Sequence, residues 1–133
     1  MLKNIFFGLL IFSGSLLFAA EPLYNVPDAP AEYAEMTNAF TSQKDLEIGK
    51  KYYQKECADC HGESGEGDAD DKSVVAFTNS AWMNTRSDGQ LFYIAAEGAG
   101  EDSDMEAYGP WSEMGYSEKR VWQMISYIRT LIK

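Results

Sequence analysis

The sequence predicts an all-α domain whose centre is filled by something other than its own side chains. Three segments carry helical periodicity with capping signals at their starts, and none of the chain shows sustained strand-like alternation. Between them lie two long stretches, residues 62–86 and 99–116, rich in Gly, Asp, Glu and Ser. Loops this long are uncommon in a compact domain, because they leave little apolar sequence to close a core.

The chain opens with a lysine tip followed by an apolar run that ends at Ala20, which is typical of a secretory signal peptide. The run is shorter than the roughly 20 apolar residues that span a bilayer. We therefore expect residues 1–20 to be a signal peptide and the remaining chain to be periplasmic or otherwise exported. The residues before the expected cut fit a cleavage site poorly, so an uncleaved anchor stays open as an alternative.

Residues 21–41 hold three of the four prolines and no sustained periodicity, so we expect an extended N-terminal arm. Such an arm is a strap across the domain, a docking tail, or a plain spacer left by export. The sequence alone favours the spacer. Residues 42–133 are then one domain, which is enough chain for a single small core.

The first helix is expected to begin at Ser42, which forms a capping pattern with Asp45. It continues through positions spaced three and four apart, namely Leu46, Gly49, Tyr53 and Cys57. A cysteine therefore lies where this helix ends.

Two further helices follow. Ser87 and Gln90 form a second capping box, after which Leu91, Ile94 and Ala95 share a face and Gly98 ends the helix. The last helix begins at Ser117. It is apolar around most of its circumference and carries one polar stripe, made of Lys119, Gln123, Ser126, Thr130 and Lys133.

The five positions from Cys57 to His61 hold both cysteines and the single histidine of the chain. The pattern C-x-x-C-H is the attachment signature of c-type haem, in which two thioether bonds and the adjacent imidazole hold the cofactor. A thioredoxin-like pair needs a neighbouring strand, and a zinc site needs four ligands. The sequence shows neither a neighbouring strand nor four zinc ligands. It therefore predicts that a porphyrin supplies the missing core.

A haem iron held by one histidine has a sixth position, and its occupant decides the function. A methionine thioether closes the site to ligands and suits electron transfer, whereas an open position binds gases or peroxide. The candidates are Met36, Met83, Met105, Met114 and Met124. Met124 falls within the apolar surface of the last helix and fits core packing, while Met105 and Met114 follow the motif in an irregular segment.

Three segments carry a resemblance to a known family: GKKYYQKECADCHGESGEGD, RSDGQLFYIAAEGAG and MEAYGPWSEMGYSEKRVWQMISYIRTL. Over residues 44–133 the chain resembles a class I c-type cytochrome. The resemblance implies a cytochrome c fold of three to five helices around one covalently bound haem c. It also implies thioethers at Cys57 and Cys60, His61 as proximal ligand and Met105 as distal ligand, with Gly49 and Tyr53 packed against Trp122 and Tyr127.

Met114 remains the alternative distal ligand, because Glu106 stands where the family usually has a proline after the methionine. The expected function is a one-electron carrier that exchanges electrons through the haem edge. Two alternatives stay open. One is the cytochrome subunit of a periplasmic dehydrogenase, docked through residues 21–41, and the other is an enzyme or gas sensor with an open sixth site.

The chain is strongly acidic, with Lys+Arg 11 against Asp+Glu 21 and a formal net charge of −10. This charge repels the phosphates of nucleic acid, so no nucleic-acid partner is expected, and a redox protein with a basic docking face is expected instead. No membrane insertion of the mature domain is expected. Acidic residues gather in both long loops, at Glu63, Glu66, Asp68, Asp70 and Asp71 and at Glu97, Glu101, Asp102, Asp104 and Glu106. They form either an acidic rim around the cofactor or two ordinary solvated loops.

Overall fold

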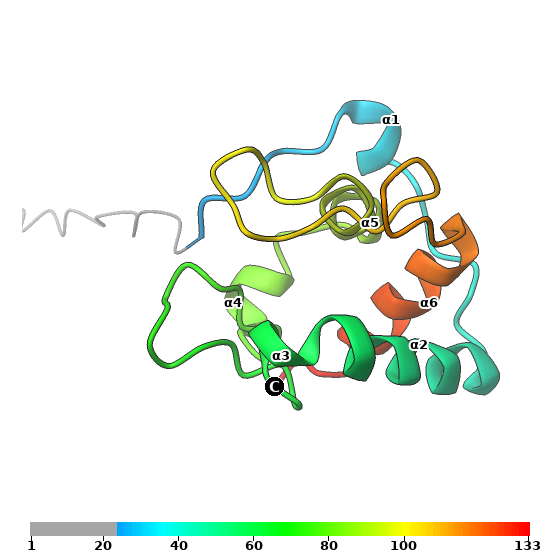
Figure 1. Ribbon diagram of the computed structural model, residues 1–133. Coiled ribbons are helices and arrows are strands. Elements are labelled where there is room, and N and C mark those ends of the chain that lie inside the picture. Colours follow the sequence, from blue (N-terminus) through cyan, green and yellow to red (C-terminus); the bar gives the residue numbers. More distant parts are fainter. Residues whose placement is uncertain (1–23) are drawn as a thin grey trace, which may run out of the picture.

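The computed structural model describes residues 24–133, which contain helices and no strands, so the all-α prediction is confirmed. The helices are α1 (Ala31–Ala34), α2 (Gln43–Glu56), α3 (Ala58–His61), α4 (Ser80–Met83), α5 (Asp88–Glu97) and α6 (Glu118–Arg129). This total is above the predicted three to five, because helices of a single turn leave no periodic pattern to read. Figure 1 shows their arrangement. The expected signal peptide lies outside the described residues.

The three longer helices begin where the capping signals predicted. Ser42 accepts the Asp45 backbone N–H, and the Asp45 side chain accepts the Ser42 N–H in return. Ser87 and Gln90 form the same reciprocal pair at the start of α5, and Ser117 caps α6. These bonds satisfy backbone donors that the first turn of a helix leaves without partners.

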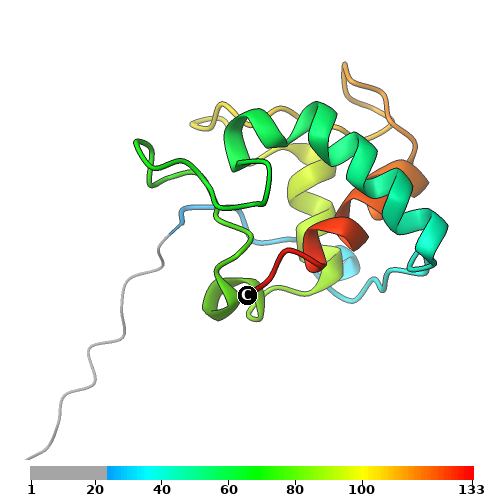
Figure 2. The same ribbon diagram turned by 90° about the horizontal axis from the view of Figure 1, so that it is seen from below.

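Helices α2 and α6 cross in close contact, as Figure 2 shows. A Cβ atom on Gly49 would stand only 1.9 Å from the backbone carbonyl oxygen of Gln123, so glycine is needed at the crossing. Beside it, the fully buried Tyr53 packs against Tyr127, with ring centroids 5.2 Å apart. The contact of Tyr53 with Tyr127 that the family resemblance implied is therefore present.

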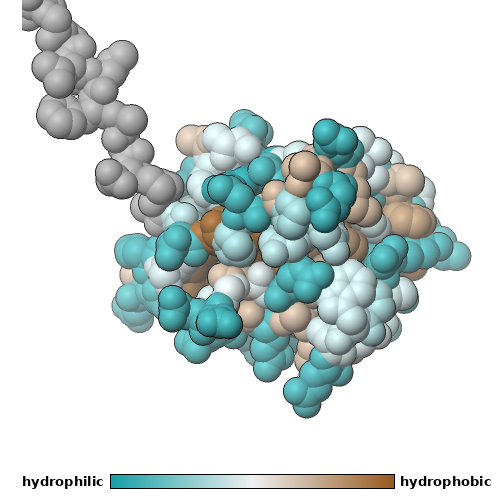
Figure 3. Space-filling view, turned by 90° about the horizontal axis from the view of Figure 1, so that it is seen from above, coloured by the Kyte–Doolittle hydropathy of each residue, from teal (hydrophilic) through white to brown (hydrophobic). Residues whose placement is uncertain are grey.

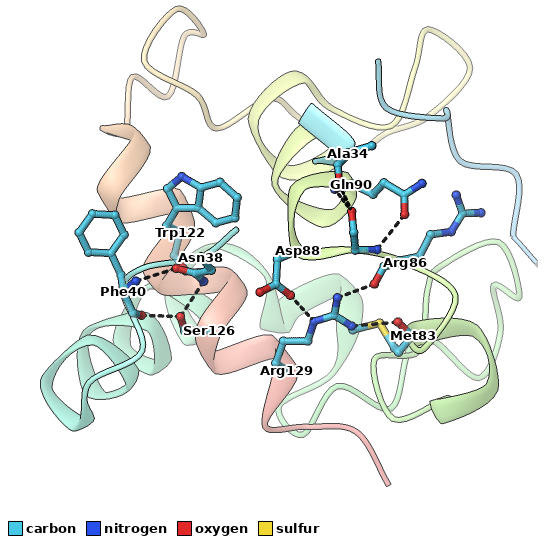
Figure 4. A network of polar contacts seen from close by, with 11 residues as sticks. Ala34, Asn38, Phe40, Met83, Arg86, Asp88, Gln90, Trp122, Ser126 and Arg129 are labelled. Atoms are coloured by element: carbon cyan, nitrogen blue, oxygen red, sulfur yellow. Dashed lines mark hydrogen bonds and ion pairs between the residues drawn. The ribbon is translucent and has the colours of Figure 1, made fainter. Parts of the chain in front are cut away.

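Part of the polar stripe on α6 is buried rather than solvated. Gln123 is only 2% exposed and donates to Asp45 Oδ1 at 2.8 Å. Ser126 is 5% exposed; its hydroxyl donates to the Phe40 carbonyl at 2.5 Å and accepts from Asn38 Nδ2 at 2.8 Å. These bonds, of which Figure 4 shows those of Ser126, compensate for burying polar groups on a core helix.

Residues 24–41 lie across α5 and α6 and include the single-turn α1 (Figure 1). Tyr24 is 5% exposed, and Tyr33 stacks on Phe92 of α5 with centroids 6.3 Å apart. Gly89 permits this contact, because a Cβ atom there would stand 1.6 Å from the Tyr33 carbonyl oxygen. Residues 24–41 thus pack on the helices, and they are called the strap below.

Arg129, at the end of α6, holds the connection between α4 and α5 in place (Figure 4). Its guanidinium donates to the carbonyl oxygens of Met83 at 2.9 Å and Arg86 at 2.5 Å, and pairs with Asp88 at 2.7 Å. One side chain thus satisfies two backbone acceptors and a carboxylate. The Arg129 side chain thus fixes the position of residues 83–88 relative to α6.

Replacing Gly49 by alanine tests the helix crossing. Because the new methyl group would overlap a backbone carbonyl that cannot rotate away, we expect Gly49→Ala to lower the free energy of unfolding by about 3 kcal/mol. The measurement is denaturant unfolding of the haem-loaded protein. Lys50→Ala, on an exposed position of the same helix, is the control and should change stability by less than about 0.5 kcal/mol. Equal stability of the two variants would contradict this account of the crossing.

Candidate functional site

The cysteine motif begins where α2 ends and continues as the single turn α3. Cys57 is at once the C-cap of α2 and the N-cap of α3, and its carbonyl accepts the His61 backbone N–H at 2.9 Å. Cys57 is half-buried and Cys60 is exposed, and both thiols are free rather than joined in a disulfide. The two sulfurs are three residues apart on helical backbone, so they lie about one turn from each other.

The imidazole of His61 is held in one orientation. Its Nδ1 lies 2.9 Å from the Val75 carbonyl oxygen, and the ring stacks on Phe77 with centroids 4.5 Å apart. A carbonyl can only accept, so Nδ1 carries the proton and Nε2 keeps its lone pair. Burial lowers the pKa of His61, which favours the neutral ring. A neutral imidazole whose other nitrogen bonds a carbonyl is the usual form of a histidine metal ligand.

The chain turns sharply directly after the histidine. Gly62 has φ +84°, a conformation that other residues rarely adopt. Its carbonyl accepts the Tyr53 hydroxyl at 2.6 Å, and the His61 carbonyl accepts the Gly67 N–H at 2.8 Å. These bonds return the following loop toward the motif, so that Val75 and Phe77 reach the imidazole.

Cys57 does not have the electrostatic setting of a redox-active thiol. Burial raises the pKa of the Cys57 thiol to about 12. A thioredoxin-like C-x-x-C pair needs the opposite shift, because its attacking sulfur must be a thiolate near neutral pH. The donor set here, two thiols and one neutral imidazole, suits covalent attachment of haem with a single nitrogen ligand to iron.

Two buried N–H groups nearby have no hydrogen-bond partner within the described part of the chain, Nε1 of Trp82 and Nε of Arg86. The Arg86 guanidinium lies over the Trp82 ring, 5.1 Å from its centroid. Tyr24 packs edge-on against Trp82 and accepts the backbone N–H of Ala76, next to Val75. An unpaired buried donor is costly, and an acidic group such as a haem propionate is an acceptor for donors of this kind. The residues present therefore fit a bound haem.

The methionine candidates come from a different part of the fold. Met105 and Met114 are both half-buried on the loop between α5 and α6. The base of this loop is tied to α5 by bonds from the Tyr108 and Gly109 N–H groups to Ala95 and Ala96, at 2.9 and 3.0 Å. In Figure 1 the loop runs above α3, the turn that carries the attachment motif. Met83 and Met124 are buried in the core.

Sequence reasoning brought Cys57, Cys60 and His61 together but missed the residues that orient the imidazole. Val75 and Phe77 lie in the stretch 62–86, which composition marks as an irregular polar loop. The available signal was a short apolar run, Val74 to Phe77, inside that loop. Its distance along the chain from His61 hid the contact.

The family model of cytochrome c matches residues 46–131, which is most of the chain, and the chain belongs to this family. Members hold a covalently bound haem c and act in electron transfer, so haem c with its iron is the cofactor of this chain. Among curated proteins, none is similar enough in sequence to match. Within residues 24–133 no helix has the length and apolar character needed to cross a membrane.

Solved structures of c-type cytochromes share the fold. Cytochrome cL from the marine methylotrophic bacterium Methylophaga aminisulfidivorans MPT aligns with a TM-score of 0.54 at 18% identity, covering 69% of this chain and 56% of that one. Cytochrome cL from Hyphomicrobium denitrificans aligns with a TM-score of 0.54 at 24% identity, covering 80% and 65%. The KustC0563 c-type cytochrome aligns with the same score at 21% identity, covering 64% and 98%. This chain thus matches less than two thirds of either cytochrome cL chain.

The unpaired indole N–H provides a test of the site. Trp82→Phe keeps an aromatic ring but removes the donor, so in the haem-loaded protein we expect the free energy of unfolding to fall by about 1–3 kcal/mol. Thermal or denaturant unfolding measures it, with Trp111→Phe as the control because Trp111 is 52% exposed. If the donor has no partner in the loaded protein, its removal would leave stability unchanged or raise it, and the assignment would be wrong.

Proposed function

We propose that this chain is a periplasmic cytochrome c with one haem, which passes one electron at a time between redox proteins. The observation that carries the proposal is the fixed imidazole of His61. Nδ1 of this ring bonds a carbonyl, which leaves Nε2 free to bind iron. The histidine directly follows Cys60, the second of two free cysteines, on a chain of the cytochrome c family. When bound, haem supplies a one-electron change at its iron.

The roles of the residues follow from their positions. Cys57 and Cys60 anchor the cofactor through thioethers, and His61 is the proximal ligand through Nε2. Met105 is the distal ligand, supported by its half-buried position on the loop that runs above α3 in Figure 1. Met114, on the same loop, is the alternative. A sixth position closed by a thioether leaves no room for a substrate, so we assign electron exchange through the haem edge and no catalytic residue.

The free carrier is favoured over a dehydrogenase subunit that docks through residues 21–41. Tyr24 and Tyr33 pack on the chain's own core. The side-chain amide of Asn38 donates hydrogen bonds to the Trp122 carbonyl and the Ser126 hydroxyl. These groups are therefore already used within the molecule. The aromatic rings and the amide that could anchor a permanent partner are thus engaged with this chain's own core.

Spectroscopy of two methionine variants tests the axial assignment. We expect the oxidised haem-loaded protein to show the weak long-wavelength sulfur-to-iron absorption band. We expect the reduced protein not to bind carbon monoxide. Met105→Ala should lose the band and bind carbon monoxide, because the sixth position opens. Met114→Ala is the matched control and should keep the wild-type spectrum.

The reverse result for the two variants would make Met114 the distal ligand. A wild-type protein that lacks the band and binds carbon monoxide would overturn the carrier proposal, and an enzyme or gas sensor with an open site would replace it.

We also propose that the electron donor or acceptor has a basic docking face. The acidic residues of both long loops are exposed, and in Figure 3 hydrophilic side chains are spread over a face on which strongly apolar side chains show only in small patches. With a net charge of −10, the chain attracts cations over the range of the Debye length. The acidic loops are thus the proposed rim of the docking surface.

Oxidants of opposite charge test the proposed rim without a known partner. Oxidation of the reduced protein by tris(phenanthroline)cobalt(III), a cation, should slow steeply as salt is added. Oxidation by ferricyanide, an anion, should accelerate, because salt screens attraction in one case and repulsion in the other. Stopped-flow absorbance gives both rates. Rates that do not depend on salt for either oxidant would show that the haem edge is not surrounded by acidic charge.

A further inference from the structure

Two tyrosine hydroxyls of one loop converge on Glu56, the last residue of α2. Tyr108 donates to the Glu56 backbone carbonyl at 3.0 Å, and Tyr116 donates to its carboxylate at 2.5 Å. The Tyr116 N–H also donates to the Tyr108 carbonyl at 3.2 Å, and the two rings stack with centroids 6.5 Å apart. Tyr108, Tyr116 and Glu56 are called the tyrosine clamp below.

The carboxylate in the clamp is well shielded from water. The Glu56 side chain is only 10% exposed, and the Lys55 ammonium contacts both this carboxylate and the Tyr116 hydroxyl, the latter at 3.0 Å. Tyr52 packs edge-on against Tyr116 with centroids 5.3 Å apart. A hydrogen bond to a charged acceptor is stronger than one between neutral groups, and shielding strengthens it further.

The position of the clamp in the chain gives it a role beyond stability. Glu56 immediately precedes Cys57, the first attachment cysteine. On the loop, Met105 lies three residues before Tyr108 and Met114 lies two residues before Tyr116. The clamp is thus a direct tie between the attachment motif and the loop that carries both candidate distal ligands.

We propose that Glu56 and its two tyrosines are positioning residues, which hold the loop of residues 105–116 against the attachment motif. They thereby control how readily the sixth position of the iron opens to an outside ligand. This inference rests on the proposed function for its effect on the iron. The tie itself rests only on the bonds described above.

The test uses the haem-loaded variants Tyr116→Phe and Tyr108→Phe, which keep the rings and remove the hydroxyls. Imidazole titration of the oxidised protein reports opening of the sixth position. Loss of one charge-assisted bond should raise the imidazole affinity of Tyr116→Phe about tenfold. Hydrogen exchange across residues 105–116 should become faster in both variants.

Two controls separate positioning from a general loss of stability. Tyr33→Phe removes another tyrosine–glutamate contact, to Glu97, that lies outside the clamp. Ile125→Val leaves a small cavity in the core, where Ile125 is 1% exposed. Both should keep the wild-type imidazole affinity and the wild-type exchange of residues 105–116, although Ile125→Val unfolds at lower denaturant.

Unchanged exchange of residues 105–116 in both tyrosine variants would overturn the proposal. If the protein shows the sulfur-to-iron band, imidazole affinities of both variants that equal the wild-type affinity would also overturn the proposal. A wild-type protein without that band would instead refute methionine ligation. Hydrogen exchange would still decide on the clamp, because it does not depend on the iron ligand.

Discussion

The close approach of α2 and α6 at Gly49 is the constraint on which the rest of the molecule depends. Without a side chain at this position, the backbone of α6 reaches α2 directly at the Gln123 carbonyl. Two parts of the surroundings of the attachment motif are then placed directly from these helices. The end of α2 presents Cys57, whereas Arg129, at the end of α6, holds the segment that follows α4.

The orientation of His61 shows how a loop without regular structure contributes to a rigid site. The loop after Gly62 has no helix until α4, but its backbone is tied to the motif at both ends. The His61 carbonyl accepts from Gly67, and the Val75 carbonyl bonds the imidazole. Apart from the Phe77 ring, the loop contacts the motif through backbone groups, so its other side chains can be acidic and exposed without disturbing the ligand.

The features that could be predicted from the sequence are those in which cause and effect lie within a few residues. Both capping boxes join positions three apart, and the attachment motif occupies five consecutive positions. The remaining features join residues far apart along the chain. Gln123 and Ser126 have the spacing of a solvated stripe. Only the folded chain shows that they are buried, with Gln123 bonded to Asp45 and Ser126 bonded to the Phe40 carbonyl. For the same reason, nothing in the sequence around Tyr116 points to Glu56, 60 positions earlier.

The strap of residues 24–41 also sets the order in which the chain can fold. The bonds from Asn38 to Trp122 and Ser126 span 84 and 88 positions. Contacts at such separation carry the cost of closing a long loop, and they form only when α6 exists to receive them. A chain emerging from the ribosome therefore keeps Asn38 and Phe40 without their partners until its last helix has been made, whereas Tyr24 and Tyr33 wait only for Trp82 and Phe92. The part of the strap around Phe40 thus stays open to protease and to aggregation until synthesis is complete.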